Sequence, residues 1–141
     1  VVVMLAAMIP VGQALETSGI SLNIANFISS TTEGMALPWL ILMVLVITMF
    51  VSDIVNNAAT AVIMAPIAAN LALQVGQPVE PFLMAVAVGA SCAFLSPIGH
   101  QCNTLVMAPG NYKFGDYWRL GLPLECVIVA ISIPMILFVW T

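Results

Sequence analysis

The sequence predicts an all-α, polytopic membrane protein. Of its 141 residues, 62% are hydrophobic and 6% are charged, and the mean hydropathy is +1.16. Soluble domains carry about 25% charged residues, so two basic and six acidic side chains are too few to cover a soluble surface. One helical crossing of a bilayer needs about 20 residues. The length therefore allows several crossings.

The same composition excludes several classes of function. Lys113 and Arg119 are the only basic residues, so the chain has no phosphate-contacting stripe for nucleic acid. It also has no paired-aspartate, Ser-His or zinc-ligand set for an intramembrane enzyme. The spacing of Cys92, His100 and Cys102 does not match a closed tetrahedral metal site. We therefore expect neither an enzyme nor a metal centre.

The first three elements are predicted from the alternation of apolar and polar stretches. Residues 1–16 are the end of a spanning helix, and residues 18–31 interleave apolar side chains with Ser and Asn, which suits an interfacial helix. Residues 35–73 are apolar around a polar group at 52–57. This pattern predicts a re-entrant hairpin whose tip is the polar group. Two full crossings are the alternative, since both leave the chain on the side where it started.

The last two elements differ in continuity. Residues 82–109 break at Ser-Pro-Ile-Gly-His-Gln-Cys-Asn, and the apolar piece after the break is too short to cross alone. One discontinuous helix with an unwound middle is the economical interpretation. Residues 118–140 form the last spanning helix. Lys113 and Arg119 flank the loop before it, and the positive-inside rule places that loop in the cytoplasm. The chain starts without Met and ends in an apolar run, so we expect a fragment of a longer polypeptide.

The hairpin tip predicts an anion site. Asn56 or Asn57 would cap the half-helix that follows the tip. The N–H groups of its first turn and its positive end would then face a small anion. Asn57, Asn56 and Thr60 are the expected substrate contacts. A second positive helix end is expected to begin at Asn103.

The unwound loop predicts a cation site. Its carbonyl groups are hard oxygen ligands for a small cation such as sodium, with Ser96, Gly99 and Asn103 as the expected cation-binding residues. Because no basic residue lies near either break, an anion would be held together with bound cations. Asp53 and His100 are the residues that proton coupling would use instead, with support of the hairpin as the alternative role for Asp53.

Residues 55–66 (VNNAATAVIMAP) and 93–103 (AFLSPIGHQCN) resemble the C-terminal repeat of the divalent anion:sodium symporters, a family of the ion transporter superfamily. Asn56-Asn57-Ala58 stand where the family carries Ser-Asn-Thr at its hairpin tip. His100-Gln101-Cys102 replace the usual Thr-Pro-Pro before the characteristic Asn. Residues 112–123 (YKFGDYWRLGLP) are similar to members with TrkA-C domains between their halves, often described as sulfate or sulfur-response permeases.

The resemblance implies secondary active transport of sulfate or a dicarboxylate, coupled to sodium, by alternating access. Binding would occur between this repeat and an inverted N-terminal repeat of the same polypeptide. The resemblance also implies a homodimer in the plasma (inner) membrane and no cofactor besides co-transported sodium. The alternatives are a proton-coupled antiporter or oxyanion exporter of the superfamily, and a non-transporting membrane assembly subunit whose polar groups form only interhelical hydrogen bonds.

Overall fold

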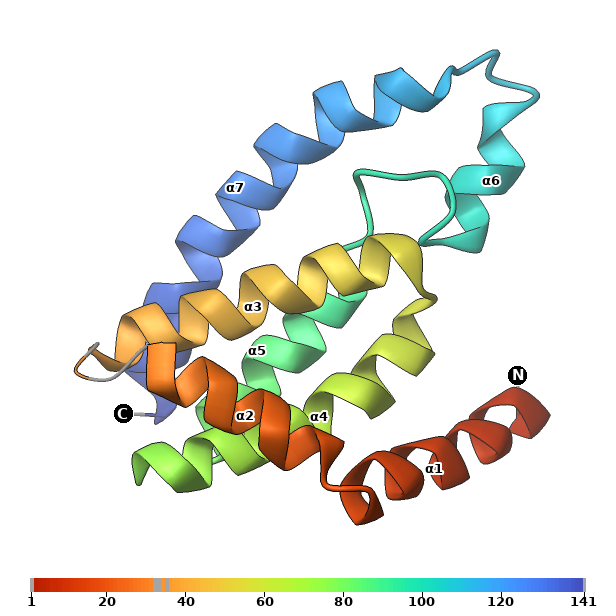
Figure 1. Ribbon diagram of the computed structural model, residues 1–141. Coiled ribbons are helices and arrows are strands. Elements are labelled where there is room, and N and C mark those ends of the chain that lie inside the picture. Colours follow the sequence, from red (N-terminus) through yellow and green to blue (C-terminus); the bar gives the residue numbers. More distant parts are fainter. Residues whose placement is uncertain (1, 32–33, 35, 141) are drawn as a thin grey trace.

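The computed structural model describes residues 2–31, 34 and 36–140. This part of the chain folds into seven helices and contains no strand, which confirms the all-α class (Figure 1). The helices are α1 (Val2–Thr17), α2 (Ile20–Thr31), α3 (Leu37–Ile54), α4 (Asn57–Val75), α5 (Glu80–Ser91), α6 (Gln101–Met107) and α7 (Phe114–Trp140).

Helix α3 organises the core. Its buried residues recur in pairs every four positions, which places them on one face of the helix. They are Leu40, Ile41, Val44, Leu45, Thr48, Met49, Ser52 and Asp53. The last two buried residues on this face, Ser52 and Asp53, are polar. The C-terminal end of α3 therefore presents polar side chains to the protein interior.

Helix α5 packs closely on α3 because α5 carries a glycine at the contact. A Cβ at Gly89 would lie 2.9 Å from Thr48 Cβ and 3.0 Å from the Leu45 carbonyl oxygen. Small residues at such positions let two membrane helices approach closely. Figure 1 shows α5 between α3 and α4, where it contacts both. This packing fixes the point at which α5 ends.

The predicted hairpin is present as a helix pair with a very short connection. Helix α3 ends at Ile54 and α4 begins at Asn57, which leaves Val55 and Asn56 between them. Among the described residues, α3, α4 and α7 are long and apolar enough to cross a membrane. The length of α3 and α4 suits two full crossings as well as a hairpin that enters and returns, so the re-entrant form stays a prediction.

The segment predicted as one discontinuous helix contains two helices, and the break between them lies earlier than the predicted residues 96–103. Helix α5 ends at Ser91 and α6 begins at Gln101, so residues 92–100 are not helical. Helix α7 starts at Phe114, before the predicted residue 118. In α7 the buried residues are Gly121 and Ile136, so most of the helix is exposed.

The N-terminal helices lie beside this core. Gly19, with φ of +71°, ends the turn between α1 and α2, so α2 starts at Ile20 and not at the predicted residue 18. Helix α1 contacts α2 and α4, and a Cβ at Gly12 would lie 2.9 Å from Val62 Cγ1. Figure 1 shows α1 extending away from the other helices.

Gly89→Val is expected to lower the free energy of unfolding by about 1–3 kcal/mol, because the added side chain overpacks the α3–α5 contact. Gly115→Val is the matched control, since a Cβ at Gly115 meets nothing within 4 Å. Thermal unfolding of the full-length protein in detergent measures both. Equal melting temperatures for the two variants would contradict close packing at Gly89.

Candidate functional site

The two interruptions of the apolar sequence meet in space. Ser52 Oγ donates a hydrogen bond of 2.8 Å to the Ala90 carbonyl oxygen. The Leu95 N–H donates to Asp53 Oδ1 at 3.1 Å, and Ser96 Oγ donates to the Asp53 carbonyl oxygen. These partners are 38 to 43 residues apart in the sequence. The hairpin tip and the unwound loop therefore form one unit.

We call this unit the tip–loop junction, residues 52–60 and 90–103. Its tightest backbone approach is at Gly99. A Cβ there would lie 2.8 Å from the Ser52 carbonyl oxygen and 3.1 Å from Asp53 Cα. Real Cβ atoms essentially never come this close to backbone, so a larger residue would separate the loop from the tip. Gly99 was predicted as part of the cation loop, and the structure gives it this spacing role.

Asn57 faces the loop. The amide orientation that satisfies both of its polar atoms points the nitrogen at three oxygens: Gly99 O at 3.2 Å, Ser52 Oγ at 3.1 Å and Ala90 O at 3.3 Å. The side chain is half-buried. Asn57 thus joins the end of α5, the end of α3 and the middle of the loop.

Asn56 is the N-cap of α4, whereas the sequence left that position open between Asn56 and Asn57. Its side chain accepts a 2.9 Å hydrogen bond from the Ala59 N–H, and its carbonyl accepts from the Thr60 N–H. These two bonds correct the expectation that the whole first turn has free N–H groups, because the cap itself uses two of them. The Thr60 hydroxyl is fully buried and has no hydrogen-bond partner among the described residues.

The second helix end lies at Gln101, which corrects the prediction of a start at Asn103. The His100 ring caps α6 by accepting from the Cys102 N–H at Nδ1. Asn103 lies inside the first turn, and its Nδ2 turns back to donate to the carbonyls of Ala93 at 3.0 Å and Ser96 at 3.3 Å. Helix α6 begins two residues earlier than predicted because the His100 side chain caps it, so that polar residues form its first turn.

Several oxygens of the predicted cation loop already accept hydrogen bonds. Ser96 Oγ accepts from the N–H groups of Ile98 and Gly99, both at 3.2 Å. The Pro97 carbonyl accepts from Thr104 Oγ1. Ser96 and Asn103 therefore hold the shape of the loop in addition to any role as ligands. The loop is kept open by side chains rather than by helical hydrogen bonds.

Two carboxylates from different helices lie beside the loop. Asp53 of α3 is 7% exposed and accepts from the Leu95 amide, while Glu125 of α7 lines a mostly apolar cavity together with Leu95. Asp53 Oδ2 and Glu125 Oε1 have no partner among the described residues. Sequence analysis missed Glu125, although an acidic residue within an apolar spanning helix is itself a signal of function.

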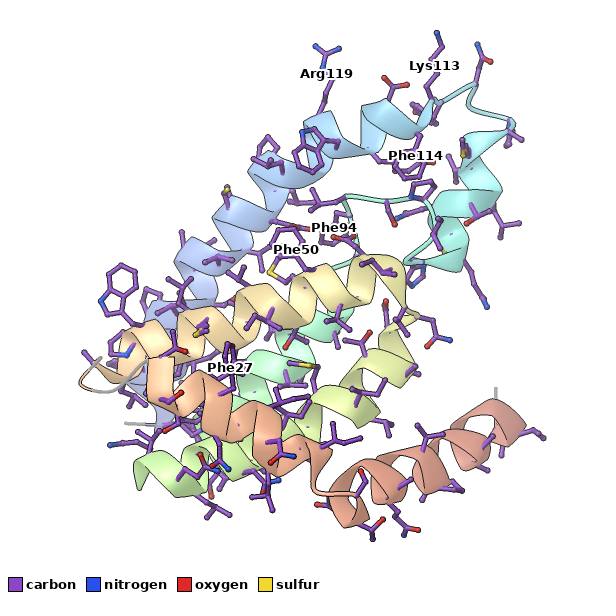
Figure 2. All side chains as sticks on the ribbon, in the orientation of Figure 1. Phe27, Phe50, Phe94, Lys113, Phe114 and Arg119 are labelled. Carbon is purple, nitrogen blue, oxygen red and sulfur yellow. The ribbon has the colours of Figure 1, made fainter. Side chains whose placement is uncertain are left out.

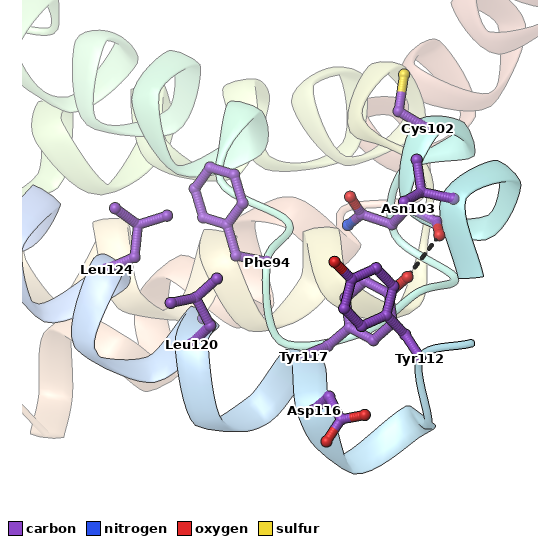
Figure 3. Close-up of a pocket in the computed structure, with 10 residues that line it drawn as sticks. Phe94, Cys102, Asn103, Tyr112, Asp116, Tyr117, Leu120 and Leu124 are labelled. Carbon is purple, nitrogen blue, oxygen red and sulfur yellow. Dashed lines mark hydrogen bonds between the residues drawn. The ribbon is translucent and has the colours of Figure 1, made fainter. Parts of the chain in front are cut away.

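The basic residues lie away from this junction. Figure 2 shows Lys113 and Arg119 pointing outward at the α6 end of α7, and both side chains are exposed. A cavity of about 310 Å³ separates α6 from α7 (Figure 3). Across it, the Tyr117 hydroxyl donates a 2.7 Å hydrogen bond to the Asn103 carbonyl. The junction therefore contains no Lys or Arg of its own.

Comparison with known proteins identifies the family. The model of the citrate transporter family matches residues 1–141. The chain belongs to the citrate transporter family. It is 38% identical over 136 residues to the uncharacterized transporter sll0640 of Synechocystis sp.. It is also 30% identical over 133 residues to sodium/sulfate cotransporter 2 of Chlamydomonas reinhardtii and 31% identical over 133 residues to sodium-dependent high-affinity dicarboxylate transporter 3 of Caenorhabditis elegans.

These matches cover 91–96% of this chain but only 22%, 15% and 23% of the three relatives. The chain thus spans about one fifth of the length of the transporters that it resembles. The predicted likeness to the divalent anion:sodium symporters is confirmed, and the family consists of transporters rather than enzymes. Together with the apolar helices, it identifies a membrane protein. The similarity to TrkA-C-containing members stays a prediction.

Ser52→Ala is expected to lower the free energy of unfolding by about 1–3 kcal/mol, because the buried Ala90 carbonyl and the Asn57 amide lose a partner. Ser91→Ala is the matched control, since Ser91 is exposed and its Oγ bonds to Ala87 of its own helix. Thermal unfolding measures the difference. If both variants melt with the wild type, the Ser52 hydrogen bonds do not hold the junction together.

Proposed function

We propose that this chain is the C-terminal repeat of a secondary active transporter that moves a small anion, sulfate or a dicarboxylate, together with sodium. The observation that carries the proposal is the tip–loop junction, where a capped helix start and an unwound loop are joined by hydrogen bonds over about 40 residues of sequence. Discontinuous helices of this kind hold substrates and coupling ions in secondary transporters. The names of the relatives support both the anion and the sodium.

The anion binds at the start of α4 in this proposal. The positive end of a 19-residue helix lies there, and the cap leaves the N–H groups of Asn57 and Ala58 for a ligand. Asn57, Asn56 and the unpaired Thr60 hydroxyl are the side chains in reach of it. The negative charge of Asp53 is directed toward Leu95 of the loop, which reduces its repulsion of an anion at the helix start.

The cation binds at the loop. Ser96, Gly99 and Asn103 supply side-chain and carbonyl oxygens, the ligands that hard cations prefer. With no Lys or Arg in the junction, a bound cation supplies the positive charge that an anion needs for favourable binding in a medium of low dielectric constant. Coupling follows, since each ion raises the affinity of the other.

The setting completes the proposal. An inverted N-terminal repeat of the same polypeptide forms the other half of the site, and two copies of the full protein form a homodimer in the plasma membrane. The positive-inside rule supports a cytoplasmic position for the α6–α7 turn, which carries Lys113 and Arg119. Alternating access then moves this repeat relative to its counterpart.

Asn57→Cys in the full-length protein, with Cys92, Cys102 and Cys126 replaced, tests the anion site by thiol labelling. Sulfate or succinate is expected to slow labelling several-fold in the presence of sodium and much less without it, because the bound anion covers the start of α4. The rate of maleimide modification measures this protection.

Asn70→Cys is the matched control, since it lies on the same helix about 20 Å away and is half-buried like Asn57. Its labelling is expected to be independent of the anion. Labelling of the Asn57→Cys thiol that ignores sulfate, succinate and sodium alike would leave the tip without a ligand and would favour the assembly-subunit alternative.

Asn103→Ala is expected to raise the sodium concentration for half-maximal uptake about tenfold, equivalent to about 1.4 kcal/mol, with a smaller effect on anion affinity at saturating sodium. The amide supplies a ligand oxygen and also holds the loop carbonyls of Ala93 and Ser96. Uptake into proteoliposomes measures the change. Asn23→Ala, at an exposed site on α2, is the control. Unchanged sodium dependence in Asn103→Ala would remove Asn103 from the cation site.

A further inference from the structure

We propose that Tyr117 of α7 is a positioning residue for the cation loop, residues 92–100. Its hydroxyl donates a 2.7 Å hydrogen bond to the carbonyl oxygen of Asn103 in α6, and this bond holds Asn103 where its side chain reaches the loop. The proposal deepens the sodium-coupled function proposed above and rests on it. It gives α7, which lies outside both predicted ion sites, a direct hydrogen bond to a residue of the cation site.

The side chain of Tyr117 turns inward from a part of α7 that is otherwise exposed. Residues 114–116 and 118–120 are all exposed, whereas Tyr117 is half-buried. Figure 3 shows its ring beside that of Tyr112 and its hydroxyl bonded to Asn103. Tyrosines near the ends of membrane helices commonly direct their hydroxyl groups to the wet interface. Here the hydroxyl bonds within the protein, so interfacial anchoring alone does not explain it.

Helix α6 depends on specific hydrogen bonds because burial does not hold it in place. None of its seven residues, Gln101–Met107, is buried. A cavity of about 310 Å³ lies between α6 and α7, so close packing against α7 does not fix the helix either. The Tyr117 hydroxyl crosses this gap. It therefore ties a short exposed helix to a 27-residue helix that is long and apolar enough to span the membrane.

Asn103 is held at its backbone and acts through its side chain. Its carbonyl accepts from Tyr117, while its Nδ2 donates to the carbonyls of Ala93 and Ser96 in the loop. A shift of the Asn103 backbone therefore moves the side-chain oxygen proposed as a cation ligand and loosens two loop carbonyls. Binding sites need their ligand groups within about 0.5 Å of the productive geometry. Loss of the Tyr117 bond is thus expected to weaken cation binding.

The same face of α7 also meets the first part of the loop. A Cβ at Gly121 would overlap the Phe94 carbonyl oxygen and lie 2.7 Å from the Phe94 carbonyl carbon. Tyr117 and Gly121 are four residues apart, so they share one face of α7. This face thus contacts both sides of the break, at Phe94 by close backbone approach and at Asn103 by a hydrogen bond. Tyr117 sets the geometry of the loop and does not itself contact the cation.

The test compares Tyr117→Phe with Tyr112→Phe in the full-length transporter. Each substitution removes one hydroxyl and keeps the ring, but only the first removes the donor to Asn103. Uptake of sulfate or succinate into proteoliposomes is measured over a range of sodium concentrations. Tyr117→Phe is expected to raise the half-saturating sodium concentration about fivefold, equivalent to about 1 kcal/mol, with little change in the maximal rate. Tyr112→Phe, at a side chain that is 50% exposed, is expected to match the wild type.

A second measurement reports on the contact without transport. Hydrogen–deuterium exchange of the full-length protein in detergent follows the amides of α6 and, for comparison, those of residues 62–73 in α4. Tyr117→Phe is expected to make the α6 amides exchange about fivefold faster, the same free energy as above, because local opening of α6 becomes less costly. The α4 amides are expected to keep their wild-type rates. Tyr112→Phe is expected to change neither set.

The outcomes separate the two proposals. If the wild type takes up neither sulfate nor succinate with sodium, the proposed function fails, while the exchange rates still test the contact between α7 and α6. If the wild type is sodium-dependent and Tyr117→Phe keeps the same half-saturating sodium concentration, the positioning role is overturned, even where α6 exchanges faster. A lower maximal rate at unchanged sodium affinity, or an equal effect of Tyr112→Phe, would overturn it as well.

Discussion

The hydrogen bonds between the polar end of α3 and the unwound loop are the interaction on which the rest of this structure depends. Residues 92–100 lie between two helices and have no helical pairing of their own. Irregular backbone at membrane depth persists only where its polar groups find partners in the protein. Ser52 and Asp53 provide those partners, from a helix whose apolar face is already packed against α5.

Side chains from both sides of the tip–loop junction contribute hydrogen bonds to it. The Asn57 amide nitrogen lies within hydrogen-bond distance of oxygens of Gly99, Ser52 and Ala90, and the Asn103 amide of α6 donates to two loop carbonyls. Buried polar networks of this type strengthen one another in a low dielectric medium, and partial loss leaves costly unpaired groups. The junction is therefore expected to move as a unit. This property suits a site in which one repeat shifts relative to another around bound ions.

The sequence identified the polar residues of both breaks but not every contact that they make. The polar residues at 52–57 and 96–103 stand out against apolar neighbours, and the preference of Asn for the N-cap predicts either Asn56 or Asn57 at that position. The start of α6 was missed because His100 caps it with a ring nitrogen, which the apolar pattern does not reveal. Glu125 was missed because a single acid in a long apolar helix does not indicate which part of the chain packs beside it.

The sequence by itself determined the all-α membrane class and the existence and approximate places of both breaks, because hydropathy and helix-breaking residues act locally along the chain. Family membership followed from the same residues. Only the tertiary structure decided that the breaks meet, that Gly99 and Gly121 admit the close backbone contacts, and that the Asp53 carboxylate of α3 accepts from the Leu95 amide of the loop. Those contacts join residues far apart in sequence, and helix packing sets them.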